Sequence, residues 1–308
     1  MSISQLANQI AVLFLLMFLG ALIRALGFFK VETINEMTNM LLYFASPIVI
    51  FYSFQKPFSI SRLHILGLVL LAVIVSYLVM IMAAKLIFQR VKDPNLRRIA
   101  RYGSVYCNNG FMGIPLALAL FGNNGVFYGV ASMAGFNLFS WTQGIGMFRQ
   151  QRPDVRDQLK QIFKNPNIIA IILGLLAFSC SLKMPTILST FMSDISSAYG
   201  PMSMIVIGCN LVGLKWRDLK LPGSMWLTLV LRNLIFPIIT IVILRLLGVT
   251  GVALYTTVIL SACPVAGVVV LFTLQAKADT KPAVVLMSVS TLLCLITIPI
   301  CFALTMLW

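Results

Sequence analysis

The stretch Cys107-Asn108-Asn109-Gly110-Phe111-Met112-Gly113-Ile114-Pro115 decides the fold, because it places two amides, two glycines and a proline inside an apolar segment. About half the chain later, Ala262-Cys263-Pro264-Val265-Ala266-Gly267 interrupts a second apolar segment. Backbone groups freed inside lipid cost several kcal/mol each unless another group satisfies them. Paired interruptions at matching positions of two halves are typical of a transporter's binding site. The two breaks therefore predict a polar site at the middle of a membrane.

Composition places the chain among polytopic membrane proteins. It is 60% hydrophobic and 10% charged, whereas soluble domains carry about 25% charged residues. No Lys or Arg precedes Arg24, so a signal peptide with a basic start is not indicated and the first apolar stretch is expected to be retained. The six cysteines lie in apolar segments without a CxxC pair or a His/Cys cluster, so no metal site or cofactor is predicted.

Apolar stretches of about 20 residues predict an all-α integral membrane protein with ten transmembrane helices. The expected spans are 5–23, 33–54, 63–88, 97–120, 124–148, 166–182, 187–213, 223–247, 251–275 and 282–307. They divide into a first five-helix repeat at 1–148, a cytoplasmic linker loop at 149–165 and a second five-helix repeat at 166–308.

The two halves share their interruptions at a nearly constant offset. Ala45-Ser46-Pro47 precedes Tyr199-Gly200-Pro201 by 154 residues, and Asn108 precedes Pro264 by 156, in a chain of 308. An offset near half the length indicates an internal duplication. Because a five-helix unit has an odd number of spans, the second copy must be inverted, and the broken spans 4 and 9 are expected to cross.

Lysine and arginine gather on one side of the predicted bundle. The loops on the other side hold only Lys56, Arg62, Lys183 and Arg245. The positive-inside rule puts the basic side in the cytoplasm and both termini outside it. The net charge of +15 thus indicates orientation in a plasma membrane and not nucleic-acid binding.

The two breaks supply the candidate substrate site. Asparagine amides offer neutral donors and acceptors, and a helix that restarts at a break presents N–H groups and a positive dipole end that favour an anion. Backbone carbonyls from the opposite half-helices would instead favour a cation, and simple kinks in packed helices are a further alternative. The predicted substrate-binding residues are Asn108, Asn109, Gly110, Pro115, Cys263, Pro264, Val265, Gly267 and, on span 5, Gln143.

Acidic residues are scarce where a cation exchanger would need them. Of eight Asp and Glu residues, only Glu36 and Asp194 fall inside predicted spans, both toward an end. Intramembrane ionisable residues are functional candidates, so Asp194 as a proton carrier and Arg232 as an attractor of anions are the coupling candidates. The ordinary alternatives are a solvated helix end for Asp194 and snorkelling toward the membrane surface for Arg232.

At these residues the chain resembles the auxin efflux carrier family, which includes bacterial organic-acid permeases and the plant PIN carriers. The matching residues are Asn108 to Leu116, Phe121-Gly122, Pro264, and Ser290-Thr291-Leu292-Leu293-Cys294-Leu295-Ile296-Thr297-Ile298-Pro299. The resemblance implies a five-plus-five inverted repeat, an elevator-like core and scaffold, carboxylate substrates, and Asn108 as the crossover asparagine that faces the substrate. Cys107 where plant carriers have proline, Val265 where they have a polar residue, and a short central loop favour a compact bacterial member.

The resulting prediction is a secondary active transporter of a small organic anion, such as malate, malonate or an auxin-like acid, with alternating access at the crossover. Its partners are the substrate and the lipid bilayer, while a proton or sodium co-substrate and a homodimer stay open. The alternatives are a cation-coupled Na⁺/H⁺ exchanger, a bile-acid-type symporter or a non-transporting receptor. An intramembrane enzyme is disfavoured, because the chain has one histidine, His64, and no central acid.

Overall fold

The structure is a computed structural model that describes residues 3–149, 156, 160, 162–212 and 221–307. Within these ranges every named secondary-structure element is a helix, and the one β-type pairing is an isolated β-bridge. Six helical segments are long and apolar enough to cross a membrane: Asn8–Ala25, Val31–Ser53, Ile60–Arg90, Asn109–Gly144, Gly223–Leu246 and Lys281–Leu307. The prediction of an all-α membrane protein is confirmed, while the division into ten spans stays a prediction. The expected linker at 149–165 lies mostly outside the described residues.

One group of helices, the scaffold bundle, packs around α9. Its members are α1 (Ile3–Ala25), α2 (Val31–Met40), η1 (Leu41–Ala45), α3 (Ser46–Ser53), α8 (Pro166–Ser179) and α9 (Thr186–Leu211). The α1 and α9 backbones meet at glycines: a Cβ on Gly20 would lie 1.9 Å from the Ile205 carbonyl oxygen, and one on Gly208 would lie 1.8 Å from that of Met17. Small residues permit such close helix approach in membranes.

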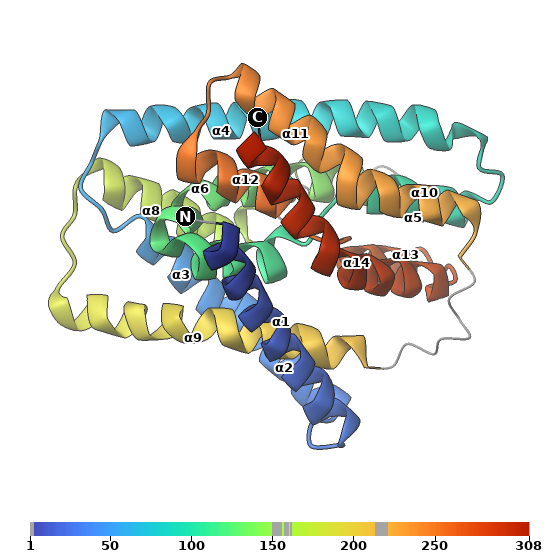
Figure 1. The fold of residues 1–308 in the computed structure, drawn as a ribbon, viewed down its shortest axis with the longest axis horizontal. Helices are drawn as coiled ribbons and strands as arrows, with labels where there is room; N and C mark the ends of the chain where they lie inside the picture. The colour runs from blue at the N-terminus through green and yellow to red at the C-terminus, as the bar shows by residue number, and fades with distance from the viewer. Residues whose placement is uncertain (1–2, 150–155, 157–159, 161, 213–220, 308) are drawn as a thin grey trace.

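The remaining helices form the core bundle, in which α6 packs chiefly on α12 and α4. Figure 1 shows α4 along one edge of the molecule and α9 along the opposite edge. The members of this bundle are α4 (Ile60–Ile87), η2 (Phe88–Arg90), α5 (Pro94–Val105), η3 (Asn109–Gly113), α6 (Ile114–Phe139), η4 (Ser140–Gly144), α10 (Gly223–Val230), η6 (Leu231–Ile235), α11 (Phe236–Leu246), α12 (Gly251–Ser261), α13 (Val268–Gln275) and α14 (Lys281–Leu307).

Local sequence explains where these helices start and change pitch. Asp93 and Asn165 accept backbone N–H groups as N-caps, and each is followed by a proline at the first helical position of α5 or α8. Three π-helical turns, η1, η3 and η6, each precede a helix whose second residue is proline. Because proline lacks an N–H, the preceding turn loses a regular hydrogen bond and widens. Two of these wide turns, η3 and η6, carry the residues of the candidate site.

Candidate functional site

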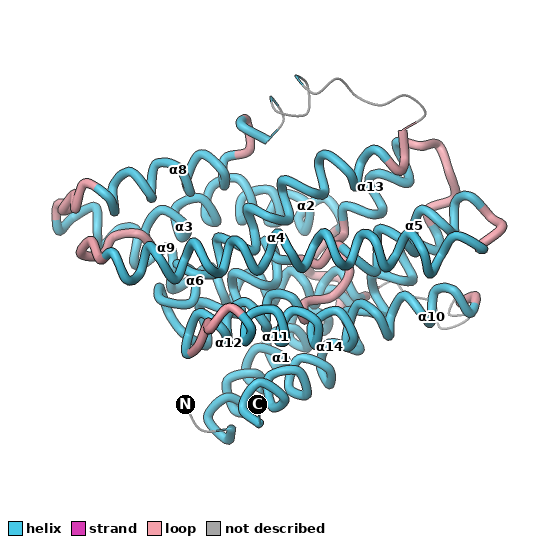
Figure 2. The backbone as a smooth tube through the Cα atoms, turned by 90° about the horizontal axis from the view of Figure 1, so that it is seen from above, coloured by secondary structure: helices cyan, strands magenta, loops and turns pink. Residues whose placement is uncertain are grey.

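The two predicted breaks cross and pair with each other. Residues Tyr106 to Asn108 form a non-helical segment between α5 and η3, and a second non-helical segment separates α12 from α13. The Asn108 N–H donates to the Pro264 carbonyl at 2.8 Å, and the Ala266 N–H donates to the Tyr106 carbonyl at 3.0 Å. Cys107 and Val265 thus form an antiparallel β-bridge. Figure 2 shows these loop segments at the centre of the molecule, surrounded by helices. Each break satisfies backbone groups of the other, as a lipid environment requires.

A polar pair on neighbouring helices holds the second break in place. The Val265 N–H donates to Ser290 Oγ at 3.0 Å, and Ser290 Oγ donates to Asn233 Oδ1 at 2.8 Å. Asn233 Nδ2 in turn donates to the Ser290 carbonyl at 3.2 Å. Asn233 lies on η6 and Ser290 on α14, and both side chains are buried. The crossing is therefore fixed by side chains from two further helices.

Two helices restart at the crossing. Asn108 caps η3, since its Oδ1 accepts from the Phe111 N–H at 3.2 Å and its carbonyl accepts from the Gly113 N–H at 3.0 Å. The second restart is α13, whose N-cap is the exposed Gly267. Asn108 is half-buried, and its Nδ2 has no hydrogen-bond partner among the described residues, so it is available to a ligand. Helix N-termini of this kind attract anions.

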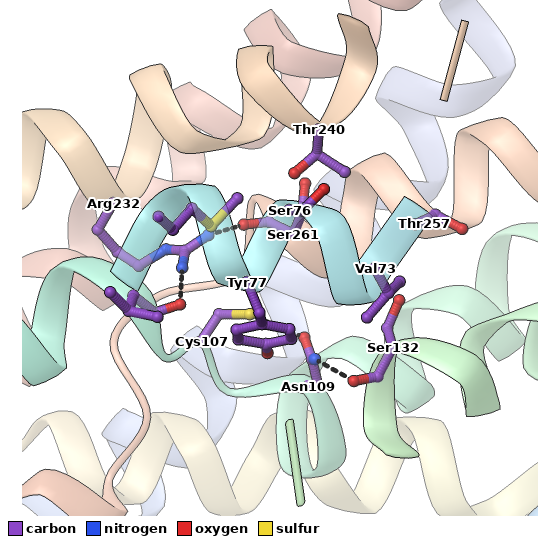
Figure 3. Close-up of a pocket in the computed structure, with 12 residues that line it drawn as sticks. Val73, Ser76, Tyr77, Cys107, Asn109, Ser132, Arg232, Thr240, Thr257 and Ser261 are labelled. Carbon is purple, nitrogen blue, oxygen red and sulfur yellow. Dashed lines mark hydrogen bonds between the residues drawn. The ribbon is translucent and has the colours of Figure 1, made fainter. Parts of the chain in front are cut away.

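Two helices also end at the crossing, and Arg232 joins their ends. Its Nη1 donates to the carbonyls of Val105 at 2.7 Å and Ser104 at 3.3 Å, in the last turn of α5. Its Nη2 donates to the carbonyl of Ser261, the last residue of α12. Figure 3 shows the guanidinium reaching from its own helix toward both partners. Only 1% of the Arg232 surface is exposed, so the expectation that this side chain snorkels to the membrane surface is wrong.

A small cavity, the Arg232 cavity, lies behind the crossing and inside the core bundle. Its volume is about 30 Å³, and Ser76, Tyr77, Cys107, Asn109 and Arg232 are among its lining residues. One water needs roughly 10–15 Å³ by this measure, so the cavity has room for water but not for a dicarboxylate. Asn109 is 2% exposed and donates to the Ser132 carbonyl at 3.0 Å. Asn109 thus supports the core bundle in this conformation.

A larger pocket, the α6–α9 pocket, lies between the two bundles. Its volume is about 310 Å³, within the range of about 300–1,000 Å³ that small-molecule sites occupy. It is lined by Tyr52, Leu118, Ala119, Gly122, Asn123, Ser193, Ser196, Ser197, Gly200 and Pro201. At Gly122 the φ of 58° and ψ of −152° are not helical, so α6 restarts at Asn123 beside the pocket. Ser196 is buried, and its hydroxyl has no hydrogen-bond partner in the part of the chain that the structure describes.

The scaffold bundle touches the crossing through α9. The Tyr199 hydroxyl donates to the Gly110 carbonyl at 3.2 Å, and a Cβ on Gly200 would lie 3.7 Å from the Pro115 carbonyl oxygen. Both Tyr199 and Gly200 are buried. Gly110 on η3 and Pro115 on α6 therefore lie against α9 of the scaffold bundle.

The remaining predicted residues fall into different surroundings. Pro115, Cys263, Pro264 and Val265 are buried in the packed crossing, and a Cβ on Gly113 would lie 3.5 Å from Cys263 Sγ. Gln143 is exposed, and its Oε1 accepts from the Tyr106 hydroxyl at 2.6 Å. Asp194 is exposed on α9 and lines neither pocket. The structure thus brings the crossing residues together, joins Gln143 to them through Tyr106, and leaves Asp194 apart from them.

Sequence reasoning missed Ser290, Asn233, Tyr199 and Ser196 as parts of the site. Ser290 was noted within the matching stretch on span 10, but one hydroxyl in an apolar helix is equally typical of intrahelical bonding. Ser196 and Tyr199 lie three residues apart on α9, so they share a helix face. The spacing predicts that the two side chains share a helix face, but it does not predict which neighbouring helix that face contacts.

Comparison with known proteins identifies the family. The model of a family described as "membrane transport protein" matches residues 6–158 and 155–302. An uncharacterized transporter of Methanocaldococcus jannaschii is 25% identical over 270 residues, which cover 83% of this chain and 85% of that protein. The family matches extend over nearly the whole chain, and they confirm the resemblance to the auxin efflux carriers. The chain therefore belongs to the membrane transport protein family and is a membrane transporter.

Proposed function

We propose that the protein is a secondary transporter of a small organic anion, which binds where the crossing meets α9. The observation that carries this proposal is the pair of helix restarts at Asn108 and Gly267, with a half-buried amide at the first. Such ends offer N–H donors and a positive dipole end to a carboxylate. The membership of this chain in the membrane transport protein family agrees with such a site and leaves the substrate to be identified by experiment.

The charges around the α6–α9 pocket support an anion. None of the described residues that line it is acidic. The Lys56 ammonium donates to Oδ1 of Asn124, the neighbour in sequence of the lining residue Asn123, and stands 5.5 Å from the centroid of the Phe127 ring. A cation near a groove raises the local concentration of anions. Lys56 is thus placed to draw a carboxylate toward the pocket.

A stripe of hydroxyls on α9 connects this pocket with the crossing. Ser196, Tyr199 and Ser203 follow the i, i+3, i+7 spacing of one helix face. The hydroxyl of Ser196 is buried without a hydrogen-bond partner among the described residues, and Tyr199 already contacts Gly110. Unpaired buried hydroxyls are costly, so we take this stripe as the polar lining of the substrate path in another conformation.

Alternating access follows from the division into two bundles. The core bundle carries both restarts and their supports, whereas the scaffold bundle contacts the crossing through α9. We propose that the core bundle moves against α9 and so carries the site from one membrane face to the other. Movement of this kind breaks one side-chain hydrogen bond at Tyr199 and leaves the Cys107–Val265 bridge intact.

Residue pairs at one sequence offset support the inverted repeat of ten spans. An offset of 156 residues relates Asn108 to Pro264, Ser76 to Arg232 and Val105 to Ser261. Both members of the last two pairs line the Arg232 cavity. Positions related by an internal two-fold axis meet when they lie near that axis. We propose that the axis passes close to this cavity.

The placement of the loops supports the proposed orientation. In Figure 1 the end of α4, the starts of α5 and α10 and the end of α13 lie toward the right, while the α3–α4 and α8–α9 loops lie toward the left. The right-hand segments carry Arg90, Lys92, Arg97, Arg98, Lys277 and Lys281, and the left-hand loops carry Lys56 and Lys183. The positive-inside rule then places the right-hand side in the cytoplasm.

The membrane potential sets the direction of uncoupled transport. An inside-negative potential favours anion export by about 2.3 kcal/mol per charge per 100 mV. Export therefore needs no coupled ion, whereas uptake needs one.

The proposal is tested by uptake of radiolabelled dicarboxylates into proteoliposomes that contain the Asn108→Ala variant. A hydrogen bond to a charged group contributes about 1.5–3 kcal/mol, so the rate should fall about 10- to 100-fold. Asn8→Ala is the matched control, because Asn8 is an exposed asparagine on α1. A screen of malate, malonate, other carboxylates and amino acids by thermal shift selects the substrate. Unchanged transport in Asn108→Ala, or stabilisation only by cationic ligands, would contradict the proposal.

A further inference from the structure

Arg232 places a charged group at the centre of the core bundle. Its guanidinium donates to three backbone carbonyls on two different helices, α5 and α12. Among the residues that the structure describes, no acidic side chain lines the cavity beside it. A buried arginine usually has a carboxylate partner. Here the partners are helix ends.

The two helix ends balance the arginine charge. Ser104 and Val105 belong to the last turn of α5, and Ser261 is the last residue of α12. The C-terminus of a helix carries about −0.5 elementary charge, so the two ends together carry about −1. One guanidinium neutralises this charge, and arginine keeps its positive charge in proteins.

Without the guanidinium, the same carbonyls would form a cation site. Unwound carbonyls and half-helix C-termini coordinate Na⁺ in secondary transporters built from broken helices. We propose that Arg232 is a built-in cation that takes the place of a coupling Na⁺ at the crossing, so that transport proceeds without sodium. The inference rests on the proposed function only for its transport measurement, because its stability measurement needs no substrate.

The geometry separates this role from substrate binding. Arg232 faces the cavity of about 30 Å³ inside the core bundle, whereas Asn108 is the half-buried N-cap of η3, the turn that contacts α9 through Gly110. Arg232 is therefore a positioning residue that acts through the ends of α5 and α12. A planar guanidinium with five donors can reach both ends at once, whereas a lysine ammonium is a single point charge.

The first experiment uses the unmodified protein. Its melting temperature in detergent and its transport rate in proteoliposomes are measured in Na⁺, K⁺ and choline buffers of equal ionic strength. We expect the same values in all three. A melting temperature or a transport rate that depends on Na⁺ would overturn the proposal without any variant.

The second experiment removes the guanidinium with Arg232→Ala. We expect a lower melting temperature and a transport rate reduced at least about tenfold, because two helix ends lose their donors. Millimolar guanidinium or Na⁺ should restore the melting temperature of this variant, and choline should not. Arg232→Lys should keep part of the stability, since it retains the charge.

Arg245→Ala is the matched control. Arg245 also donates to a helix carbonyl, that of Thr305 at 2.7 Å, but it lies in the last turn of α11 away from the crossing. The Arg245→Ala variant should show no dependence of its melting temperature on Na⁺ and no rise of that temperature on addition of guanidinium. If Arg232→Ala folds but gains no stability from guanidinium or Na⁺, or if Arg245→Ala gains as much, the proposal is refuted. A different outcome is that guanidinium or Na⁺ restores the melting temperature of Arg232→Ala while neither the unmodified protein nor any variant transports dicarboxylates. That result would refute the proposed function and support the role of Arg232 as a built-in cation.

Discussion

Ser290→Ala should destabilise the crossing of the two breaks. The Ser290 hydroxyl accepts from the Val265 N–H and donates to Asn233 Oδ1. Its removal leaves two buried polar groups unpaired, at a cost of about 1–3 kcal/mol each, so the expected loss is about 2–6 kcal/mol. Hydrogen bonds between transmembrane helices average only about 0.6 kcal/mol, because freed groups find other partners. The Val265 N–H cannot do so, since it lies in a non-helical segment.

The measurement is the melting temperature of the purified protein in detergent, followed by a double-mutant cycle with Asn233→Ala. The control is Thr291→Val on the same helix, because the Thr291 hydroxyl donates to the Met287 carbonyl of its own helix. Each kcal/mol corresponds to about 2–4 °C in domains of this order of size, so Ser290→Ala should melt at least about 4 °C lower than the control. Equal melting temperatures for Ser290→Ala and Thr291→Val would refute the assignment.

Two further predictions concern the scaffold and the pocket. Gly208→Ala places a Cβ 1.8 Å from the Met17 carbonyl oxygen. The helices α1 and α9 must then separate, and the free energy of unfolding should fall by about 1–3 kcal/mol. Thermal unfolding should show no such loss for the control Gly67→Ala, whose Cβ would meet nothing within 4 Å among the described residues. Burial, and then the charge of Arg62, lower the pKa of Lys56 to about 8. Lys56 therefore loses its positive charge as the pH rises through about 8, and the affinity for an anionic substrate should fall over that range. Lys56→Arg should keep the affinity at high pH, and a flat profile in the unmodified protein would count against the role of Lys56.

The Lys56 shift also predicts a change in stability. The folded protein favours the neutral amine, so between pH 8 and 10.5 the unfolded chain binds more protons than the folded one. Stability should therefore rise with pH across this window. The comparison is the melting temperature of the unmodified protein and of Lys56→Met, in which this rise should be absent.

The positions of the breaks were predictable from the sequence because they depend on local chemistry. Glycine and proline weaken a helix wherever they stand, and Asn108 with Pro264 marked both interruptions correctly. The meeting of the two breaks followed from their matching positions in the two halves of the chain and from the family resemblance. The all-helical class followed from composition in the same way.

The roles of the individual side chains were harder to predict from the sequence. Asn108 and Asn109 are adjacent and chemically identical, yet one is half-buried at the restart and the other lies inside the core bundle. A rotation of about 100° per residue separates neighbours on a helix, and the irregular turn between them changes that angle further. Which amide faces the scaffold therefore depends on the packing of the whole bundle.

By itself the sequence determined an all-helical membrane transporter with two broken helices, because apolar length and backbone chemistry act over a few residues. Only the tertiary structure decided what satisfies the broken ends. Arg232 is 127 residues from Val105 and 29 from Ser261, and neither pairing has a pattern in the sequence. The ends of α5 and α12 carry negative dipole charge wherever they lie, but only folding brings one arginine within reach of both.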